Sequence, residues 1–281
     1  MANARAIKNR IKTVTNTGKI TKTMAMVSTA KATKAVTQIK NSRPYAERLM
    51  GQLEMLGSAT DTHPLFQKNE GVEKTLLVVI TSNRGLCGGY NANIIRLAKA
   101  AKNESTDVLM FGKKGAGAFR FVGLEMKEQF VDLTDIPAFE YASAFADKLI
   151  QAYQEGCYSK VEIIYSKYYS AGSQKPVQET LLPLSSGASD EESEYGVEPL
   201  FSPSKEKLLE ALVPKVIRLS VFKYMLDAVA SEHLARQLAM NSASDNASEM
   251  VKILTLNYNR ARQAQITTEL SEIVGGAEAL K

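Results

Sequence analysis

The sequence contains no tryptophan, and only two histidines and two cysteines among its 281 residues. Two thiols in unrelated contexts do not suggest a disulfide framework, so we expect Cys87 and Cys157 to be free. His63 and His233 lie far apart, and the segment SEHLARQ lacks the second histidine of a helical zinc site. Neither cysteine has an identifiable activating base. The sequence therefore predicts no catalytic residues, no metal site and no cofactor, and it favours a packing role for His233.

Long apolar runs are also absent. No stretch approaches the roughly 18 consecutive apolar residues of a membrane-spanning helix. The N-terminus is basic and polar and lacks the apolar centre of a secretory signal. With 44% hydrophobic and 23% charged residues, the composition is typical of a soluble globular protein. We therefore expect neither a membrane span nor export.

Aromatic residues are absent from positions 1–44, where positive charge is concentrated. Residues 1–56 contain eleven lysines and arginines and two glutamates, whereas the whole chain has a net charge of +5. A basic helix can bind nucleic acid, meet an acidic protein surface or simply be solvated. Because a single-strand binder needs aromatic stacking platforms, we expect no nucleic acid as a partner.

Apolar residues recur at helical spacing through the first of three regions. They are Ile7, Ile11, Val14, Ile20, Met24, Val27, Val36, Ile39, Leu49, Leu53 and Leu56. The step from Val14 to Ile20 breaks the heptad pattern and includes Gly18, so any supercoil there must be irregular. We predict one helix from about residue 3 to residue 57, and residues 1–57 form the first predicted domain.

The second region, residues 74–184, has the pattern of an α/β layer domain. Short apolar runs rich in β-branched residues predict buried strands, and helical patterns lie between them. The expected strands are KTLLVVITS (74–82), DVLMFG (107–112), KVEIIYSKYYS (160–170) and VQETLLPL (177–184), the last a candidate edge strand. The expected helices are YNANIIRLAKAAK (90–102) and YASAFADKLIQAYQEG (141–156).

Residues 185–203 are rich in acids and small residues and are predicted to form a surface loop. The third region, residues 204–281, returns to helical spacing, and Ser202 and Pro203 suit its cap and first turn. Pro214 removes a backbone donor and clashes with the preceding turn, so we expect a kink or a separate short helix there. Beyond it, nothing in the sequence forces the helix to stop before Gly275.

The two terminal helices are too long for a small domain. At about 1.5 Å per residue, a helix of about 60–70 residues extends for roughly 90–105 Å, and one of about 55 residues for roughly 80 Å. The economical arrangement is an antiparallel pair with the α/β domain inserted between the helices and attached near one end. The C-terminal helix should overrun its partner, which would leave part of its tip without an intramolecular contact.

Three segments resemble the gamma subunit of F-type ATP synthase, the central stalk of the rotary enzyme. They are IKNRIKTVTNTGKITKTMAMVSTAK, TSNRGLCGGYN and ASEHLARQLAMNSASDNASEMVKILTLNYNRARQAQITTELSEIVGGAEAL. The resemblance covers both ends and the middle of the chain, in the family's order. It implies an α+α/β fold in which the N- and C-terminal helices form a long antiparallel coiled coil with an inserted Rossmann-like α/β domain.

The resemblance also implies a function and partners. A non-catalytic stalk subunit would couple proton translocation in the membrane sector to ATP synthesis and hydrolysis, by asymmetric contact with the three catalytic sites. Its partners would be the alpha and beta subunits of the catalytic hexamer, the epsilon subunit and the membrane ring of c subunits. The inserted cysteine pair of chloroplast members is absent. We therefore expect a bacterial protein, held peripherally at the cytoplasmic face of the cell membrane.

Individual residues follow from the same resemblance. Met24 matches a methionine near the acidic lever loop of the catalytic subunit, and Arg236, Gln263 and Thr267 match residues that make polar contacts with the ring. The family usually has aspartate where this chain has Asn83. The tip SEIVGGAEAL is small and sparsely charged, as a sliding surface requires, although a frayed terminus would have the same composition.

Charge adds a further set of interface residues, Lys8, Arg10 and Lys12. These basic side chains could attract acidic loops of the catalytic subunits over a distance. The alternative is that they lie on a solvated face and contribute nothing to coupling.

Two other function classes remain open. TSNRGLCGGYN is a glycine-rich turn after a strand, but its spacing fits neither the GxGxxG nor the GxxxxGK[ST] nucleotide motif. FGKKGAGAF (111–119) is a second such turn, whose lysines could attract an anion; we expect a tight structural turn. A non-rotary coiled-coil adaptor or tether would explain the long helices equally well, but would not affect ATP turnover.

Overall fold

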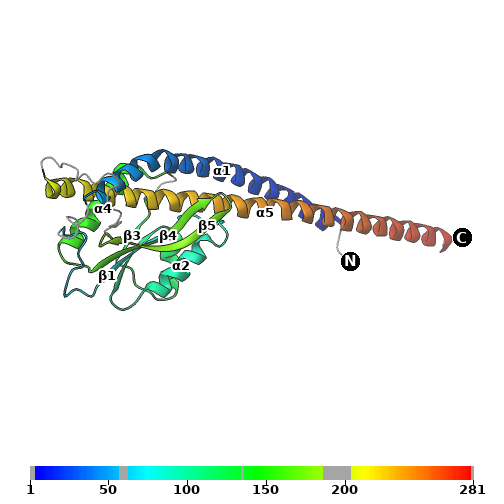
Figure 1. Cartoon of the computed structure of the whole chain (residues 1–281). Helices are drawn as coiled ribbons and strands as arrows, with labels where there is room; N and C mark the ends of the chain where they lie inside the picture. Colours follow the sequence, from blue (N-terminus) through cyan, green and yellow to red (C-terminus); the bar gives the residue numbers. More distant parts are fainter. Residues whose placement is uncertain (1–3, 57–62, 134–135, 186–203, 280–281) are drawn as a thin grey trace. The chain divides into compact units, whose positions relative to one another are not determined.

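The computed structural model describes residues 4–56, 63–133, 136–185 and 204–279. The chain divides into two compact units, one made of residues 1–28 together with 236–281 and the other of residues 29–235. Two long helices enclose the remaining elements in the sequence, α1 (Ala4–Glu54) and α5 (Lys205–Ala279). Figure 1 shows them in blue and in yellow to red. The predicted terminal helices are therefore present, and the acidic segment 186–203 lies outside the described residues.

The prediction of a separate short helix ending near Pro214 is wrong, because α5 continues through this residue as one helix. Leu209 and Val213 precede the proline, Val216 and Ile217 follow it, and all four are buried in the same core. Proline costs one backbone hydrogen bond. Burial of apolar side chains on both sides offsets that cost, because each contributes about 1.5–3 kcal/mol.

The five-stranded sheet has the order β3-β2-β1-β4-β5. Its strands are β1 (Thr75–Ile80), β2 (Thr106–Phe111), β3 (Glu128–Phe130), β4 (Lys160–Ser170) and β5 (Ser173–Leu182). The first four are parallel, and β5 pairs antiparallel with β4 at the edge. The connecting helices are α2 (Tyr90–Ala101), α3 (Lys113–Phe121) and α4 (Phe139–Gln154). A parallel sheet with crossover helices confirms the Rossmann-like α/β prediction.

The α/β region also contains two elements that the sequence did not predict, β3 and α3. The segment FGKKGAGAF, expected to be a tight turn, instead ends β2 and begins a nine-residue helix. Gly112 supplies the sharp turn between them, with a φ of 93°. Gly115 then lets α3 pack closely against β1, because a Cβ atom there would lie 2.5 Å from Thr81 Oγ1.

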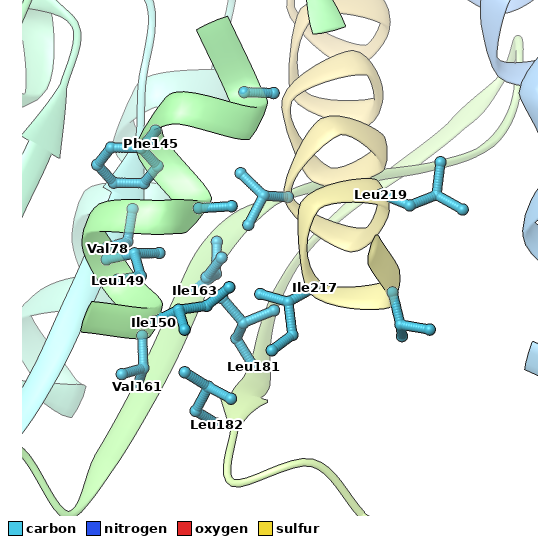
Figure 2. Close-up of a cluster of buried hydrophobic side chains, with 14 of the residues drawn as sticks. Val78, Phe145, Leu149, Ile150, Val161, Ile163, Leu181, Leu182, Ile217 and Leu219 are labelled. Atoms are coloured by element: carbon cyan, nitrogen blue, oxygen red, sulfur yellow. The ribbon is translucent and has the colours of Figure 1, made fainter. Parts of the chain in front are cut away.

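Alternating side chains of the strands fill two cores. Leu77 and Val79 of β1 point to the core formed with α2 and α3. Leu76, Val78 and Ile80 point to the opposite core, which is completed by α4, the first part of α5 and the end of α1. Figure 2 shows this second core, where side chains of β1, β4, β5, α4 and α5 meet. Burial on both faces explains why the inner strands read as continuous apolar runs.

Within the unit made of residues 1–28 and 236–281, helices α1 and α5 run antiparallel. Residues Ala4 to Arg10 share a groove with Leu254 to Thr268, whereas Val14 to Lys22 share one with Asn241 to Lys252. The helices come close at Gly18, where a Cβ atom would lie 3.3 Å from Ala247 Cβ. Ser244 Oγ donates to the Gly18 carbonyl oxygen at 3.5 Å. The predicted antiparallel pairing is therefore confirmed, and Gly18, which interrupts the heptads, is a point of close approach.

Replacing Gly115 and Gly117 on the same helix should have opposite effects on stability. Gly115→Ala forces a methyl group against Thr81 and Met110 and should lower the free energy of unfolding by about 1–3 kcal/mol. Gly117→Ala meets nothing within 4 Å and should raise it by about 0.5–1 kcal/mol, because alanine loses less backbone entropy. Denaturant unfolding of both variants measures the difference. Equal effects would contradict the close packing of α3.

The register of the helix pair can be tested by cross-linking. In a Cys157→Ser background, Gly18→Cys with Ala247→Cys should form a disulfide on mild oxidation, because the separation is close to the 3.5–4.5 Å between Cβ atoms of natural disulfides. Gly18→Cys with Glu249→Cys is the control, since two residues further along the helix the side chain points to the other side. Mobility on a non-reducing gel reports the link. Cross-linking of the control pair alone would contradict the register.

Candidate partner interface

The backbone donors at the glycine turn after β2 bond to the protein itself. At the start of α3, Lys113 N donates to Asn83 Oδ1 at 3.1 Å and Lys114 N donates to the Ser82 oxygen at 3.1 Å. Gly115 N donates to Thr81 Oγ1 at 3.0 Å. A phosphate site needs such donors to be directed at a ligand. These three are directed at β1 and the turn that follows it, which argues against a nucleotide site there.

A polar cleft of about 380 Å³ lies at the carboxyl edge of the sheet, where α/β proteins commonly bind ligands. Asn83 lines this cleft. The Asn83 Nδ2 donates to the Val131 oxygen at 2.9 Å and to the Leu133 oxygen at 3.3 Å. An aspartate could not make these bonds, because an ionised carboxylate is only an acceptor. Asn83 therefore joins the turn after β1 to the segments after β2 and β3, and its role is structural.

The cysteines and histidines lie in separate environments in the part of the chain that the structure describes. Cys87 is buried, Cys157 is exposed, and both are free as predicted. His233 is 3% exposed and lines the cleft, in keeping with a packing role. Among the described residues, no three side chains of His, Cys, Asp or Glu are grouped to hold a metal ion.

The structure places the predicted interface residues in different environments. Lys8, Arg10 and Lys12 are exposed on α1, and Met24 is half-buried on the same helix. Gln263 and Thr267 are exposed one turn apart on α5, where Thr267 Oγ1 donates to the Gln263 backbone oxygen at 3.0 Å. Arg236 is only 6% exposed. The seven residues therefore differ in their exposure to solvent.

A long groove between α1 and α5 was not predicted. It has a volume of about 960 Å³, and Arg10 is the one predicted interface residue in its wall. Ile7, Leu254 and Ala261 provide its apolar surface, and Asn257 and Arg260 provide polar groups. The antiparallel pairing of the terminal helices was predicted, but not that their contact leaves an open groove.

The last turns of α5 have an apolar surface that no described residue of the chain covers. Leu270, Ile273 and Val274 are 57%, 68% and 58% exposed. The helix continues through Gly275 and Gly276 to Ala279. Contiguous exposed apolar surface marks sites of interaction with other chains. The predicted overrun of the C-terminal helix is present among the described residues.

No helix within residues 4–56, 63–133, 136–185 and 204–279 is both long and apolar enough to cross a lipid bilayer.

Comparison with known proteins places the whole chain in one family. The family model described as ATP synthase matches residues 3–280. The ATP synthase gamma chain of Leptospira biflexa is 41% identical and that of Heliobacterium modesticaldum 42% identical, each over 100% of both chains.

Solved structures share the fold. A chain of the Euglena gracilis mitochondrial ATP synthase, in its OSCP/F1/c-ring structure in rotational state 3, matches with a TM-score of 0.71 at 23% identity, over 99% of this chain and 94% of that chain. A chain of the Tetrahymena thermophila mitochondrial ATP synthase, in a structure of the central stalk and c-ring, matches with a TM-score of 0.61 at 24% identity, over 80% and 99%. From its sequence relatives, the chain belongs to the family of ATP synthase gamma chains.

Proposed function

We propose that the chain is the rotary central stalk of an ATP synthase. It couples proton translocation through the membrane sector to ATP synthesis and hydrolysis in a threefold catalytic ring. The observation that carries this proposal is the pair of antiparallel helices whose C-terminal member presents uncovered Leu270, Ile273 and Val274. Such a surface needs a surrounding partner, and membership of the gamma chain family supplies one.

The mechanism follows from unequal contact. A partner can shift the equilibrium of a catalytic site only by binding its open and closed states differently. One helix pair inside a ring of three equivalent sites necessarily presents a different face to each. The two helices differ in charge and length, so their faces differ as well. Rotation of the pair then takes each site through the same sequence of nucleotide affinities.

Within the complex, the subunit itself is non-catalytic. The engagement of the α3 donors with β1 and the following turn supports this assignment. The partners are the alpha and beta subunits around the helix pair, and the epsilon subunit and c-ring at the α/β domain. The strong similarity to bacterial gamma chains supports a peripheral location at the cytoplasmic face of a bacterial cell membrane.

The proposed contacts divide into three kinds. Gln263 and Thr267, exposed on α5, offer polar groups to the ring, and Met24 offers a half-buried apolar contact on α1. Lys8, Arg10 and Lys12 offer positive charge to acidic loops. Arg236, which is 6% exposed, acts by holding the local helix surface in position and offers little area of its own to a partner.

Reconstitution with and without this chain tests the proposal. The isolated chain should show no ATPase activity, assemble as one copy per catalytic ring, and be required for ATP synthesis driven by an ion gradient. ATP formation in proteoliposomes is the measurement. If the catalytic ring coupled ATP synthesis to the ion gradient equally well without the chain, the rotary function would be contradicted. The alternative function, a non-rotary adaptor or tether, would then remain.

The role of positive charge on α1 is tested by Lys8→Ala, Arg10→Ala and Lys12→Ala combined. Exposed charge pairs contribute about 0.2–1 kcal/mol each, so the triple variant should slow ion-coupled synthesis by about threefold or more. Raised ionic strength should reduce the difference from the wild type. Removing Lys68, Lys99 and Lys148, which are exposed on the other unit, is the charge-matched control. Unchanged coupling in the α1 variant would mean that these three side chains only lie on a solvated face.

A further inference from the structure

A buried acidic residue lies where α5 packs on the β4–β5 hairpin. Asp227 is 3% exposed, and its neighbours in the sequence, Leu226 and Ala228, are buried too. One turn further along α5, Ser231 Oγ donates to the Ser166 oxygen of β4 at 2.9 Å, which fixes the helix to the strand. A carboxylate at such a position loses its hydration and must be compensated by the groups around it.

The groups around Asp227 replace the lost hydration of its carboxylate poorly. Lys167 of β4 donates to Glu179 of β5 at 2.7 Å, so its charge is already paired. The rings of Tyr165 and Tyr224 lie 4.8 Å apart, and the buried Tyr165 hydroxyl makes no hydrogen bond of good geometry. An incompletely satisfied buried polar cluster is a weak point in a core.

Every element packed here contributes a titratable or charged group. They are Lys223 and Tyr224 on α5, Tyr165 and Lys167 on β4, Glu179 on β5, Tyr90 on α2, and Lys31 and Lys34 on α1. The Tyr90 hydroxyl donates to the Ala228 oxygen at 3.1 Å. Lys31 and Lys34 precede Ala35, which packs on α5. Lys223 and Lys167 favour the ionised form of Asp227, and Glu179 opposes it. The cluster thus contains both signs of charge, with burial as the deciding influence.

Burial has the largest effect on the acidity of Asp227, and it raises the pKa of the carboxyl from 3.8 to about 7. In the unfolded chain the carboxyl loses its proton near its ordinary value, whereas in the folded chain it keeps the proton to about pH 7. The folded state therefore binds more protons in this interval, and its stability falls as the pH rises through it. Well above pH 7 the carboxyl is ionised in both states, and the loss is then complete and constant.

We propose that Asp227 makes the packing of α5 on the β4–β5 hairpin depend on a proton. The neutral carboxyl packs against the tyrosines and holds the helix on the hairpin, and the ionised carboxyl loosens this contact. The device lies within residues 29–235 and acts whether or not the chain rotates in a complex. The packing of α5 on the β4–β5 hairpin would therefore be more stable at acidic pH than at alkaline pH.

The test compares thermal unfolding of the full-length wild type and Asp227→Asn, whose amide imitates the neutral acid. The wild-type midpoint should fall by roughly 3–8 °C between pH 5 and pH 8. Asp227→Asn should abolish most of that fall and unfold at a higher temperature than the wild type at pH 8. Measurement stays above pH 5, because Glu179, whose pKa is lowered, adds its own loss of stability in more acidic solution.

Two further variants separate titration of Asp227 from general effects of charge. Lys223 is exposed, so Lys223→Gln should fold normally, and it should move the midpoint of the stability change to higher pH because it removes a charge that favours ionisation. Asp245→Asn, at an exposed position of the same helix, should keep the wild-type pH dependence.

Local loosening is measured by hydrogen exchange at a single pH. At pH 8, peptides covering residues 160–182 should exchange faster in the wild type than in Asp227→Asn. A wild-type midpoint that is flat or rises from pH 5 to pH 8 would overturn the proposal, and so would an unchanged profile in Lys223→Gln. The wild-type and Lys223→Gln results decide the matter even where Asp227→Asn fails to fold.

Discussion

The structure depends on the burial of one half of a single long helix. Leu209, Val213, Ile217 and Met225 fix the first half of α5 against the sheet and α4, and this packing is strong enough to carry the helix through Pro214. The second half of the same helix keeps Leu256, Leu270 and Ile273 exposed. An element that is anchored at one end and uncovered at the other suits a part that transmits torque from its anchored end to surrounding subunits.

Periodicity predicted most of the fold, because the elements that carry it are long or deeply buried. Val78 and Ile163 lie in continuous apolar runs, so their strands were predictable, and so were the two terminal helices. The three-residue β3 has no apolar pattern, and α3 contains Gly115 and Gly117, which favour a turn in isolation. Tertiary contacts determine both, and a local pattern cannot show them.

The candidate site was predictable to a smaller extent. Basic side chains such as Lys8 and Arg10 are exposed, as their composition indicated. The burial of Arg236 was not foreseen, because arginine is rarely buried and nothing adjacent marks it. Asp227 offered a readable signal, an acid inside the apolar run MLDAVA, yet only the packing of β4 and β5 shows how little compensates it.

Direct observation of rotation tests the central proposal most strictly. Cys157 is exposed and Cys87 buried, so the natural sequence offers one accessible thiol for a visible marker. With the catalytic ring of the assembled complex fixed to a surface, the marker should turn in one direction during ATP hydrolysis and pause at three equally spaced positions. A marker that stays at one angle while ATP is hydrolysed would contradict the account.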